Sequence, residues 1–552
     1  MTEPAASRGT VTSTALPLTV LPLTALTVAA LALRALDLSK LQLWEDEAAT
    51  WHFGRLTAAG RLMEQISLEP TPPLYYGLIG WIMKLFGESD LVMRWPSVIF
   101  GAALVPVVFF AGRELWSARA GWIAAVLVAV HPWHVAASRE ARVYPLFAVL
   151  TALAWWLLWR ALEQGTLKNW AAVTVGVALA CYSHLFGLFV GFAAGVAVLA
   201  WGRGLKGRLH GLAALALAGL LFVPYLVVTI PNLSQSGAAW SVVALYEILP
   251  DERNLLRPFE LILVGADYHV FMREMAQPPT PSWIYGSSLL AQLVLIAAAI
   301  AAAMRLPERR SALLFLGAGW VVPILVPWIV NHFHVFFQTG RHELFVVGPA
   351  MLVIAAGADF LLENRHRRIP GALLLATLLL TTLLLTTVVV AAVHRHHSLL
   401  ALPPTTGQKY TAAWVASRAN PGDVVLAFGI RRLLAEHYLR LAGSDIRVVS
   451  FPPSTDSHPG WSDDQEHLRD RAALARIAAE QAAELGKEIP ANGQLFVLAR
   501  RYETVQAVDG TMLRALQAEG WQRVDFDEKE TLIALRRDSR HQGSRHQSGE
   551  SP

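Results

Sequence analysis

The stretch PGALLLATLLLTTLLLTTVVVAAV, residues 370–393, contains no charged residue and is long enough to cross a membrane. As an α-helix it would extend about 36 Å at 1.5 Å per residue, against a hydrocarbon core of about 30 Å. Apolar runs of similar character recur upstream, beginning at Thr14. Because runs of about 18 or more apolar residues predict transmembrane helices, the sequence predicts a polytopic membrane protein.

The composition of the 552 residues agrees with this prediction. Apolar residues make up 54% of the chain and charged residues 16%, whereas soluble domains have about 25% charged residues. The formal net charge of +4 does not indicate nucleic acid binding, because most basic residues stand in short clusters between apolar runs. The single cysteine, Cys181, lies in an apolar run and excludes an intrachain disulfide.

The run from Pro73 to Gly87 differs from the others because, at about 22 Å as a helix, it is too short to span. We expect it to lie on the membrane surface or to re-enter it. If it does not cross and the N-terminus is cytoplasmic, the clusters of Arg and Lys fall on the cytoplasmic side, as in most membrane proteins. The sequence therefore predicts about eleven spans in a bacterial-type inner membrane, with an extracytoplasmic C-terminal domain.

This topology divides the chain into three parts. Residues 1–400 form a transmembrane module with two long outer loops, 37–94 and 231–284. Residues 401–538 form an extracytoplasmic domain, and residues 539–552 a disordered tail. In the extracytoplasmic domain, predicted helices alternate with predicted strands at residues 424–428, 446–451 and 494–498. The alternation indicates a small, mainly parallel α/β sheet, and the domain has no glycine-rich phosphate loop.

Carboxylates follow the first apolar run in the segment Trp44-Glu45-Asp46-Glu47. Such a cluster beside a membrane is often only a solvated collar with an interfacial Trp. A carboxylate in a low-dielectric pocket at this depth would instead have a raised pKa and be a better base for an acceptor hydroxyl.

Further polar clusters interrupt the apolar pattern where spans meet the outer face. In Ser138–Tyr144, Arg142 could contact a phosphate and Glu140 could orient it, or the two could form a local pair on an exposed turn. The segment 331–343 places Arg341 at another outer mouth, and His184 lies between two spans. His332 and His334 lack a helical His-x-x-x-His spacing and a nearby Cys, so zinc has weak support.

These clusters, in this order, resemble glycosyltransferase family 39, which includes protein O-mannosyltransferases and lipid A aminoarabinose transferases. Segment 69–76 (EPTPPLYY) is similar to the family's His-Pro-Pro-Leu-Tyr-Tyr, with Thr71 in place of His. Segment 94–97 (RWPS) is similar to Arg-Leu-Pro-Ser, 138–144 to the Glu-Ala-Arg-x-Tyr box, and 182–184 to Tyr-x-His. Gly340-Arg341 and Gly348-Pro349 are similar to an Arg-Tyr…Pro element, with His342 in place of Tyr.

The resemblance implies a mainly α, polytopic bundle of the GT-C type and a sugar donor carried on polyprenyl phosphate. Asp46, with Glu47, would take the proton of the acceptor hydroxyl in a single inverting displacement. The residues implied in binding the donor phosphate or the substrate are Glu69, Tyr75, Glu140, Arg142, Tyr144, His184 and Arg341. No cofactor is required, because a lipid monophosphate offers no diphosphate for a metal to chelate.

The expected function is therefore transfer of a sugar to a protein, lipid or cell-wall glycan, with membrane lipid as a further partner and no nucleic acid. An oligosaccharide ligase with a diphosphate-linked donor is the nearest alternative. A transporter would carry ionisable residues at mid-membrane rather than at the outer interface, and a receptor would not require carboxylates and Arg around one cavity.

Overall fold

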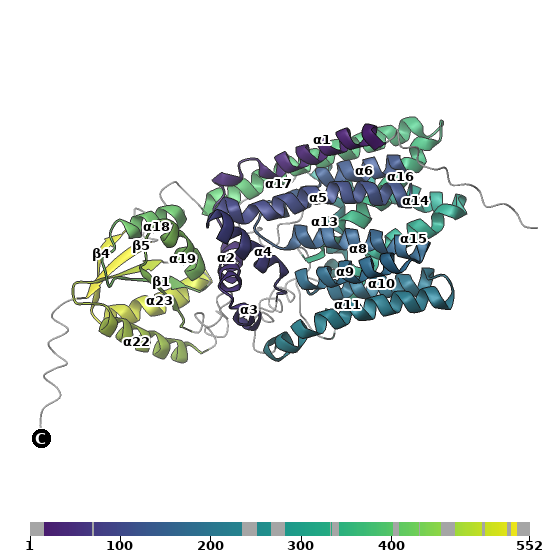
Figure 1. Ribbon diagram of the computed structural model, residues 1–552. Helices are drawn as coiled ribbons and strands as arrows, with labels where there is room; N and C mark the ends of the chain where they lie inside the picture. Colours follow the sequence, from purple (N-terminus) through teal and green to yellow (C-terminus); the bar gives the residue numbers. More distant parts are fainter. Residues whose placement is uncertain are drawn as a thin grey trace, which may run out of the picture.

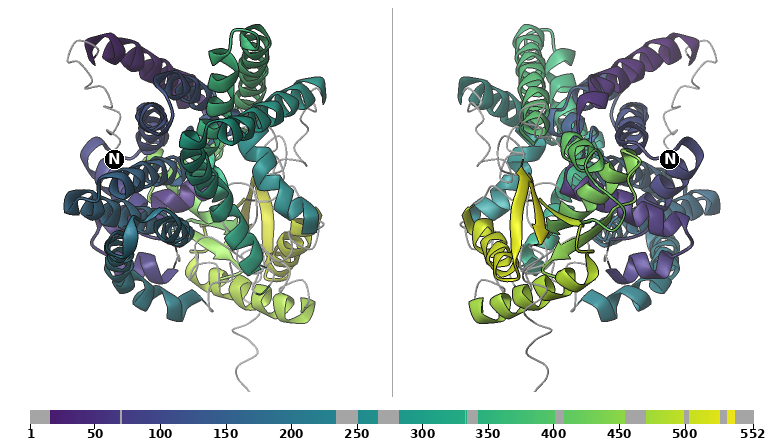
Figure 2. Two further views of the ribbon diagram at one scale, coloured as in Figure 1. Left: turned by 90° about the vertical axis from the view of Figure 1, so that its right-hand side faces the viewer. Right: turned by 90° about the vertical axis from the view of Figure 1, so that its left-hand side faces the viewer.

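The structure, a computed structural model, consists of a helical bundle with a small sheet domain at one end (Figure 1). It describes residues 16–68, 71–233, 251–265, 282–331, 333, 342–400, 408–429, 431–453, 470–498, 503–526 and 532–537. Figure 1 shows the sheet at one end of the molecule and the start of α1 toward the other, and Figure 2 shows the sheet in front of the helices when the molecule is viewed from the sheet end. The predicted transmembrane module and the predicted C-terminal domain therefore lie end to end in one elongated molecule.

The long helices of the bundle are those that the apolar runs predict. Within the described residues, eight helices are long and apolar enough to cross a membrane. Their helical bounds are α1 (Leu16–Ala35), α5 (Asp90–Leu115), α8 (Tyr144–Gln164), α11 (Gly204–Leu233), α14 (Ser282–Arg305), α15 (Pro307–Asn331), α16 (Val347–Glu363) and α17 (Arg368–Leu400). The fold class, a mainly α polytopic bundle with a small sheet domain, is confirmed.

Three further predicted spans fall on shorter helices, α6 (Ala118–Ala129), α9 (Leu167–Ser183) and α10 (Gly187–Trp201). Ser117 and Thr166 begin α6 and α9, because each side chain accepts a hydrogen bond from a backbone N–H in the first turn. At about 18 to 26 Å these helices are shorter than a hydrocarbon core, so the count of eleven spans stays a prediction.

The run that was expected not to cross forms α4 (Leu74–Phe86), beside α2 (Glu45–Ala58) and α3 (Leu62–Leu68). Figure 1 shows these three helices between the bundle and the sheet, with α2 steeply inclined to the long helices. A Cβ added at Gly80 of α4 would collide with the Gly54 carbonyl of α2, so these glycines allow the two backbones to touch. The structure thus forms a layer of short helices over one end of the bundle.

The sheet domain contains five strands in the order β2-β1-β3-β5-β4. Strand β1 pairs in parallel with β2 and β3, whereas β5 pairs antiparallel with β3 and β4. The strands and helices are β1 (Val424–Phe428), β2 (Arg447–Phe451), β3 (Gln494–Leu498), β4 (Trp521–Phe526), β5 (Leu532–Arg537), α18 (Gln408–Ala416), α19 (Arg431–Leu441), α22 (Arg471–Glu488) and α23 (Glu503–Ala518).

The expectation of a mainly parallel sheet is therefore wrong, since half of the strand pairs are antiparallel. The three predicted strands match β1, β2 and β3, but β4 and β5 were not predicted. Both are rich in charge: β4 reads WQRVDF and β5 ends in Arg536-Arg537. Such sequences carry a weak apolar alternation, and the pairing with β3 supplies the structure. The predicted tail, 539–552, lies outside the described residues.

Candidate active site

The predicted carboxylates form the first turn of α2. Trp44 is the N-cap, and its backbone N–H donates to Oε2 of Glu47, 3.3 Å away. Acidic groups in a first turn also favour helix formation, since they face the positive end of the helix dipole. The local sequence therefore explains why the helix begins here and why Asp46 and Glu47 both lie at its buried end.

Glu47 is fully buried and fixed on both oxygens. Arg94 of α5 donates Nε to Oε1 at 2.7 Å and Nη2 to Oε2 at 2.6 Å, and neither side chain is exposed. The backbone N–H of Ala141 also donates to Oε1, at 2.7 Å. With Trp44 on Oε2, the carboxylate accepts four hydrogen bonds, which is its ordinary capacity.

Arg94 also binds the backbone of the chain segment that leads into α2. Its Nη1 donates to the carbonyl of Leu41 and its Nη2 to the carbonyl of Gln42, both at 2.7 Å. Arg94 was noted only as part of a motif and not predicted as a site residue. The signal was present, because an Arg that opens a transmembrane helix needs a buried partner.

The Ser138–Tyr144 loop, which leads into α8, reaches the same place. Nη1 of Arg142 donates to the backbone carbonyl of Asp46 at 3.0 Å, and Nη2 lies 3.6 Å from Oδ2 of Asp46. Burial alone would lower the pKa of Arg142, but the Asp46 carboxylate raises it well above its usual value. Arg142 is therefore a permanent cation at this site.

Tyr75 supports the loop from α4. Its hydroxyl lies 2.6 Å from Oγ of Ser97, and Ser97 donates to the carbonyl of Arg142 at 2.9 Å. Burial, with the negative charges of Glu47 and Glu140 nearby, raises the pKa of Tyr75, so it remains a neutral phenol. The segments that carry Tyr75 and Ser97 in the two motifs thus meet at the Arg142 backbone.

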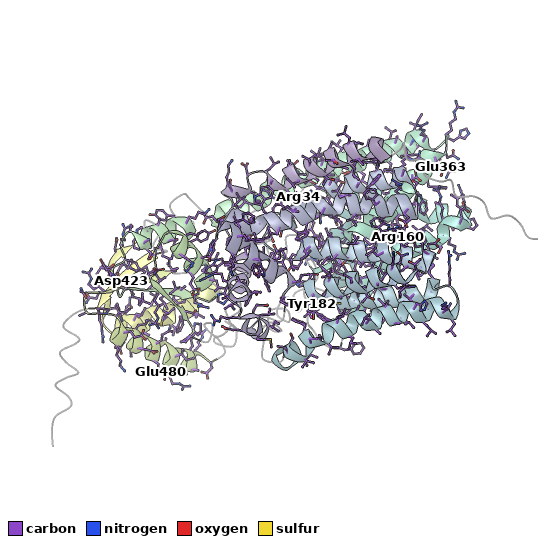
Figure 3. All side chains as sticks on the ribbon, in the orientation of Figure 1. Arg34, Arg160, Tyr182, Glu363, Asp423 and Glu480 are labelled. Atoms are coloured by element: carbon purple, nitrogen blue, oxygen red, sulfur yellow. The ribbon has the colours of Figure 1, made fainter. Side chains whose placement is uncertain are left out.

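Two buried arginines hold the other end of this loop through backbone carbonyls. Arg34 of α1 donates to the carbonyls of Val128 and Ala129 at the end of α6, and Arg139 donates to the carbonyl of Arg34 at the end of α1. Helix C-termini carry partial negative charge, which offsets the cost of burying these cations. Arg34 lies nearer the sheet domain than Arg160 and Glu363 do (Figure 3).

Next to Arg142 the site is aromatic. Tyr144 and His184 are 6.1 Å apart between ring centroids, and His342 lies 6.1 Å from Tyr144 and 5.5 Å from His184. Nδ1 of His184 accepts from the backbone N–H of Phe186 at 3.1 Å. Burial, with His342 and Arg142 nearby, lowers the pKa of His184 well below its usual value. His184 is therefore neutral near pH 7 and offers an Nε2–H donor rather than a charge.

The structure thus brings six predicted residues to one end of the bundle: Asp46, Glu47, Tyr75, Arg142, Tyr144 and His184. Glu140 is buried beside them, 4% exposed, and its carbonyl accepts from the Arg142 N–H. Glu69 and Arg341 lie outside the described residues, although His342, next to Arg341 in the chain, belongs to the aromatic group.

Within the described part of the chain, no three His, Cys, Asp or Glu side chains are grouped closely enough to hold a metal ion. His332 and His334 lie outside that part. The expectation that catalysis requires no metal or other cofactor therefore stays a prediction.

Residues 70–228 match the family model described as dolichyl-phosphate-mannose-protein mannosyltransferase. The matched segment includes the Tyr75 and Arg94 motifs, the Arg142 loop and His184, but not Asp46. No curated protein sequence matches the chain.

Solved structures match nearly the whole chain. The ArnT structure from Cupriavidus metallidurans in the apo state is 12% identical with a TM-score of 0.56, and the match covers 95% of this chain and 98% of ArnT. The same protein bound to undecaprenyl phosphate gives 14% identity, a TM-score of 0.55 and coverage of 94% and 98%. The oligosaccharyltransferase AglB from Archaeoglobus fulgidus, in complex with an inhibitory peptide and a dolichol-phosphate, is 11% identical with a TM-score of 0.54. The match covers 96% of this chain and 75% of AglB.

The family match and the shared fold confirm the predicted resemblance and the enzyme class. The chain is a multi-pass membrane protein of the GT-C fold, related to the GT-C glycosyltransferases.

Proposed function

We propose that this protein transfers a sugar from a polyprenyl-monophosphate carrier to an acceptor hydroxyl on the extracytoplasmic face of the membrane. The observation that carries the proposal is the pair formed by buried Asp46 and half-buried Arg142, 3.6 Å apart. A base for the acceptor and a cation for the leaving phosphate are the two groups that an inverting displacement requires.

Arg142 is the proposed phosphate contact. A guanidinium binds phosphate through two parallel N–H donors, and burial strengthens the interaction because water does not screen it. The neutral His184 adds an Nε2–H donor, and Tyr144 lies beside both. Arg341, next to His342 in the chain, is retained as a predicted second cation, and Glu69 as a predicted substrate contact.

Asp46 is the proposed base. While Arg142 lies against it, the carboxylate is stabilised in its charged form and is a weak base. A lipid phosphate that binds Arg142 competes for this cation, and a buried carboxylate that loses a cationic neighbour becomes a stronger base. Donor binding would thus activate the base, and the proton of the acceptor hydroxyl would pass to Asp46 as the oxygen attacks C1 of the sugar.

Glu47 is assigned a different role from the one the resemblance suggested. Its four hydrogen bonds with Arg94, Ala141 and Trp44 occupy the ordinary capacity of the carboxylate, so it has no position left for the hydroxyl of the sugar acceptor. We propose that Glu47 positions the start of α2 and the Arg142 loop, and that Asp46 alone receives the proton.

The alternative donor is a diphosphate-linked oligosaccharide. It would bring a second phosphate, and with it a need for a metal ion or for cations beyond Arg142 and the predicted Arg341. This difference favours a monophosphate donor.

The test is a transfer assay with the purified protein in lipid nanodiscs. Undecaprenyl-monophosphate sugars with a radiolabelled sugar would be compared with diphosphate-linked oligosaccharides, using protein, lipid and cell-wall fractions as acceptors and the Asp46→Asn variant as the blank. The proposal predicts label transfer from a monophosphate donor. Transfer from diphosphate donors alone would instead establish the ligase. Uptake of label into proteoliposomes that contain the protein, without a glycoside product, would establish a transporter.

A further inference from the structure

The sheet domain touches the candidate site through α19, which packs on α2. The hydroxyl of Tyr438 accepts a hydrogen bond from the backbone N–H of Leu43 at 2.6 Å and donates to Oδ2 of Asp90 at 3.0 Å. All three groups are buried. Leu43 lies three residues before Asp46, so the contact reaches the segment that leads into the base.

Asp90, the first residue of α5, collects further groups from the sheet domain. Nε2 of His437 lies 2.9 Å from Oδ1 of Asp90, and Nζ of Lys409 lies 2.9 Å from Oδ2. The His437 ring also meets the indole of Trp51 on α2 edge to face, with 5.1 Å between centroids. A buried carboxylate with partners on several sides is costly to disturb, because loss of one partner leaves charge uncompensated.

The segment 41–44 is therefore held from two sides. On the bundle side, Arg94 binds the carbonyls of Leu41 and Gln42, and it lies one helical turn after Asp90. On the domain side, Tyr438 binds the N–H of Leu43, and the backbone N–H of Lys409 donates to Oε1 of Gln42 at 3.3 Å. An extended segment before a helix has unpaired backbone groups, and these contacts satisfy several of them.

We infer that Tyr438, His437 and Lys409 are positioning residues of the sheet domain, which through Asp90 and Leu43 hold Asp46 in register with Arg142. The inference rests on the proposed role of Asp46 where it concerns the rate of transfer, but not where it concerns the order of the segment. Burial and the adjacent Asp90 raise the pKa of Tyr438, so its hydroxyl remains a neutral donor.

The chain offers a matched control on the same helix. Arg440 of α19 lies 3.3 Å from Glu88, just before α5, and its side chain is 52% exposed. This pair joins the domain to the bundle without a contact to residues 41–47, and exposed pairs contribute little stability. If simple tethering were the role of α19, Arg440→Gln and Tyr438→Phe would behave alike.

The experiment compares Tyr438→Phe, Arg440→Gln and wild type as full-length proteins in nanodiscs. Hydrogen–deuterium exchange would follow peptides that contain Leu43, and transfer would be measured with the donor that the assay above identifies. We expect exchange at Leu43 to accelerate about tenfold or more in Tyr438→Phe, because its acceptor is gone. We also expect kcat to fall about tenfold, which corresponds to roughly 1.4 kcal/mol, with undecaprenyl phosphate binding changed less than twofold. Arg440→Gln should match wild type in all three.

A second pair of variants keeps the test decisive if Tyr438→Phe does not fold. His437→Gln retains an N–H donor toward Asp90 and should restore most of the kcat that His437→Ala loses. Unchanged exchange at Leu43 in Tyr438→Phe, or equal behaviour of His437→Gln and His437→Ala, would overturn the inference. Faster exchange at Leu43 with unchanged kcat would show that the contact of Tyr438 with Leu43 orders the segment without affecting catalysis, and would overturn the positioning role. Normal transfer by Asp46→Asn would remove the proposed base while leaving the exchange result intact.

Discussion

The two ends of the helical bundle both bury charge, but they use it differently. At the end far from the sheet domain, Asp359 of α16 accepts hydrogen bonds from Nε1 of Trp116 at 3.1 Å and Oγ of Ser117 at 2.9 Å. It also pairs with Arg119 and, at 3.5 Å, with Arg309. This carboxylate joins the ends of α5, α6, α15 and α16, and every contact serves to hold helices together.

At the site end, two adjacent carboxylates differ in the same way within one helical turn. Glu47 is bound by Arg94 at 2.6 and 2.7 Å and resembles Asp359 in the number of its donors. Asp46 lies 3.6 Å from Arg142, beyond the usual length of a charge-assisted hydrogen bond. The comparison teaches that burial of charge does not by itself identify a site, because Glu47 is held as closely as Asp359 although it lies next to the proposed base.

The largest expected effect separates Asp46 from Glu47. Asp46→Asn keeps the side-chain volume but removes the base, so transfer should fall by about two to four orders of magnitude with little loss of folded protein. Glu47→Gln should lower the folded fraction first. The readouts are single-turnover transfer and thermal unfolding on the same purified samples. Near-normal transfer by Asp46→Asn, with strong loss only in folded Glu47→Gln, would move the base one residue along the chain.

The next effect tests whether Glu47 and Asp359 are equivalent structural ties. Arg94→Ala leaves Glu47 buried without its cation, and loss of one partner of a buried pair typically costs about 3–5 kcal/mol. Asp359→Ala should destabilise the protein to a similar degree, since it removes the acceptor of Trp116 Nε1 and Ser117 Oγ together with the charge partner of Arg119 and Arg309. Thermal unfolding in detergent would measure both. A change of less than about 1 kcal/mol, as for an exposed ion pair, would contradict this assignment for either residue.

The smallest effect concerns the basic surroundings of α2 at the site end. Burial, together with Arg432, Arg55 and Arg61, lowers the pKa of His52 from 6.5 to about 4. Below pH 6.5 His52 is protonated in the unfolded chain but stays neutral in the folded protein until about pH 4. His52 therefore destabilises the fold as the pH falls from about 6.5 toward 4. The stability of wild type relative to His52→Gln should decline over that window. A difference between the two proteins that does not depend on pH would contradict the prediction.

The bundle was predictable because a transmembrane helix can be recognised from its own sequence alone. Its apolar run must match the thickness of the hydrocarbon core. The prediction that α4 does not cross the membrane came from the same rule, since its apolar run is too short. Strands β4 and β5 were missed because their charged sequences depend on pairing with β3, a contact between distant segments.

In the candidate site, the sequence could predict Asp46, Arg142 and His184 because polar residues at span mouths are costly unless they are used or paired. The sequence could not separate Asp46 from Glu47, since adjacent carboxylates on one turn differ only in their partners. Those partners, Arg94 and the Ala141 N–H, come from segments 47 and 94 residues away. Tyr438, 395 residues from Leu43, carries no local signal at all.

Binding of undecaprenyl phosphate to purified Arg142→Gln and Arg119→Gln compares the two ends of the bundle in one titration. Both substitutions remove a guanidinium that pairs with a buried aspartate, one beside Asp46 and one beside Asp359. If the site end holds the lipid phosphate, Arg142→Gln should weaken binding about tenfold or more, as expected for a charge-assisted bidentate contact, while the folded Arg119→Gln variant binds like wild type. Equal affinities for wild type and Arg142→Gln, or a loss confined to Arg119→Gln, would contradict the assignment of the site.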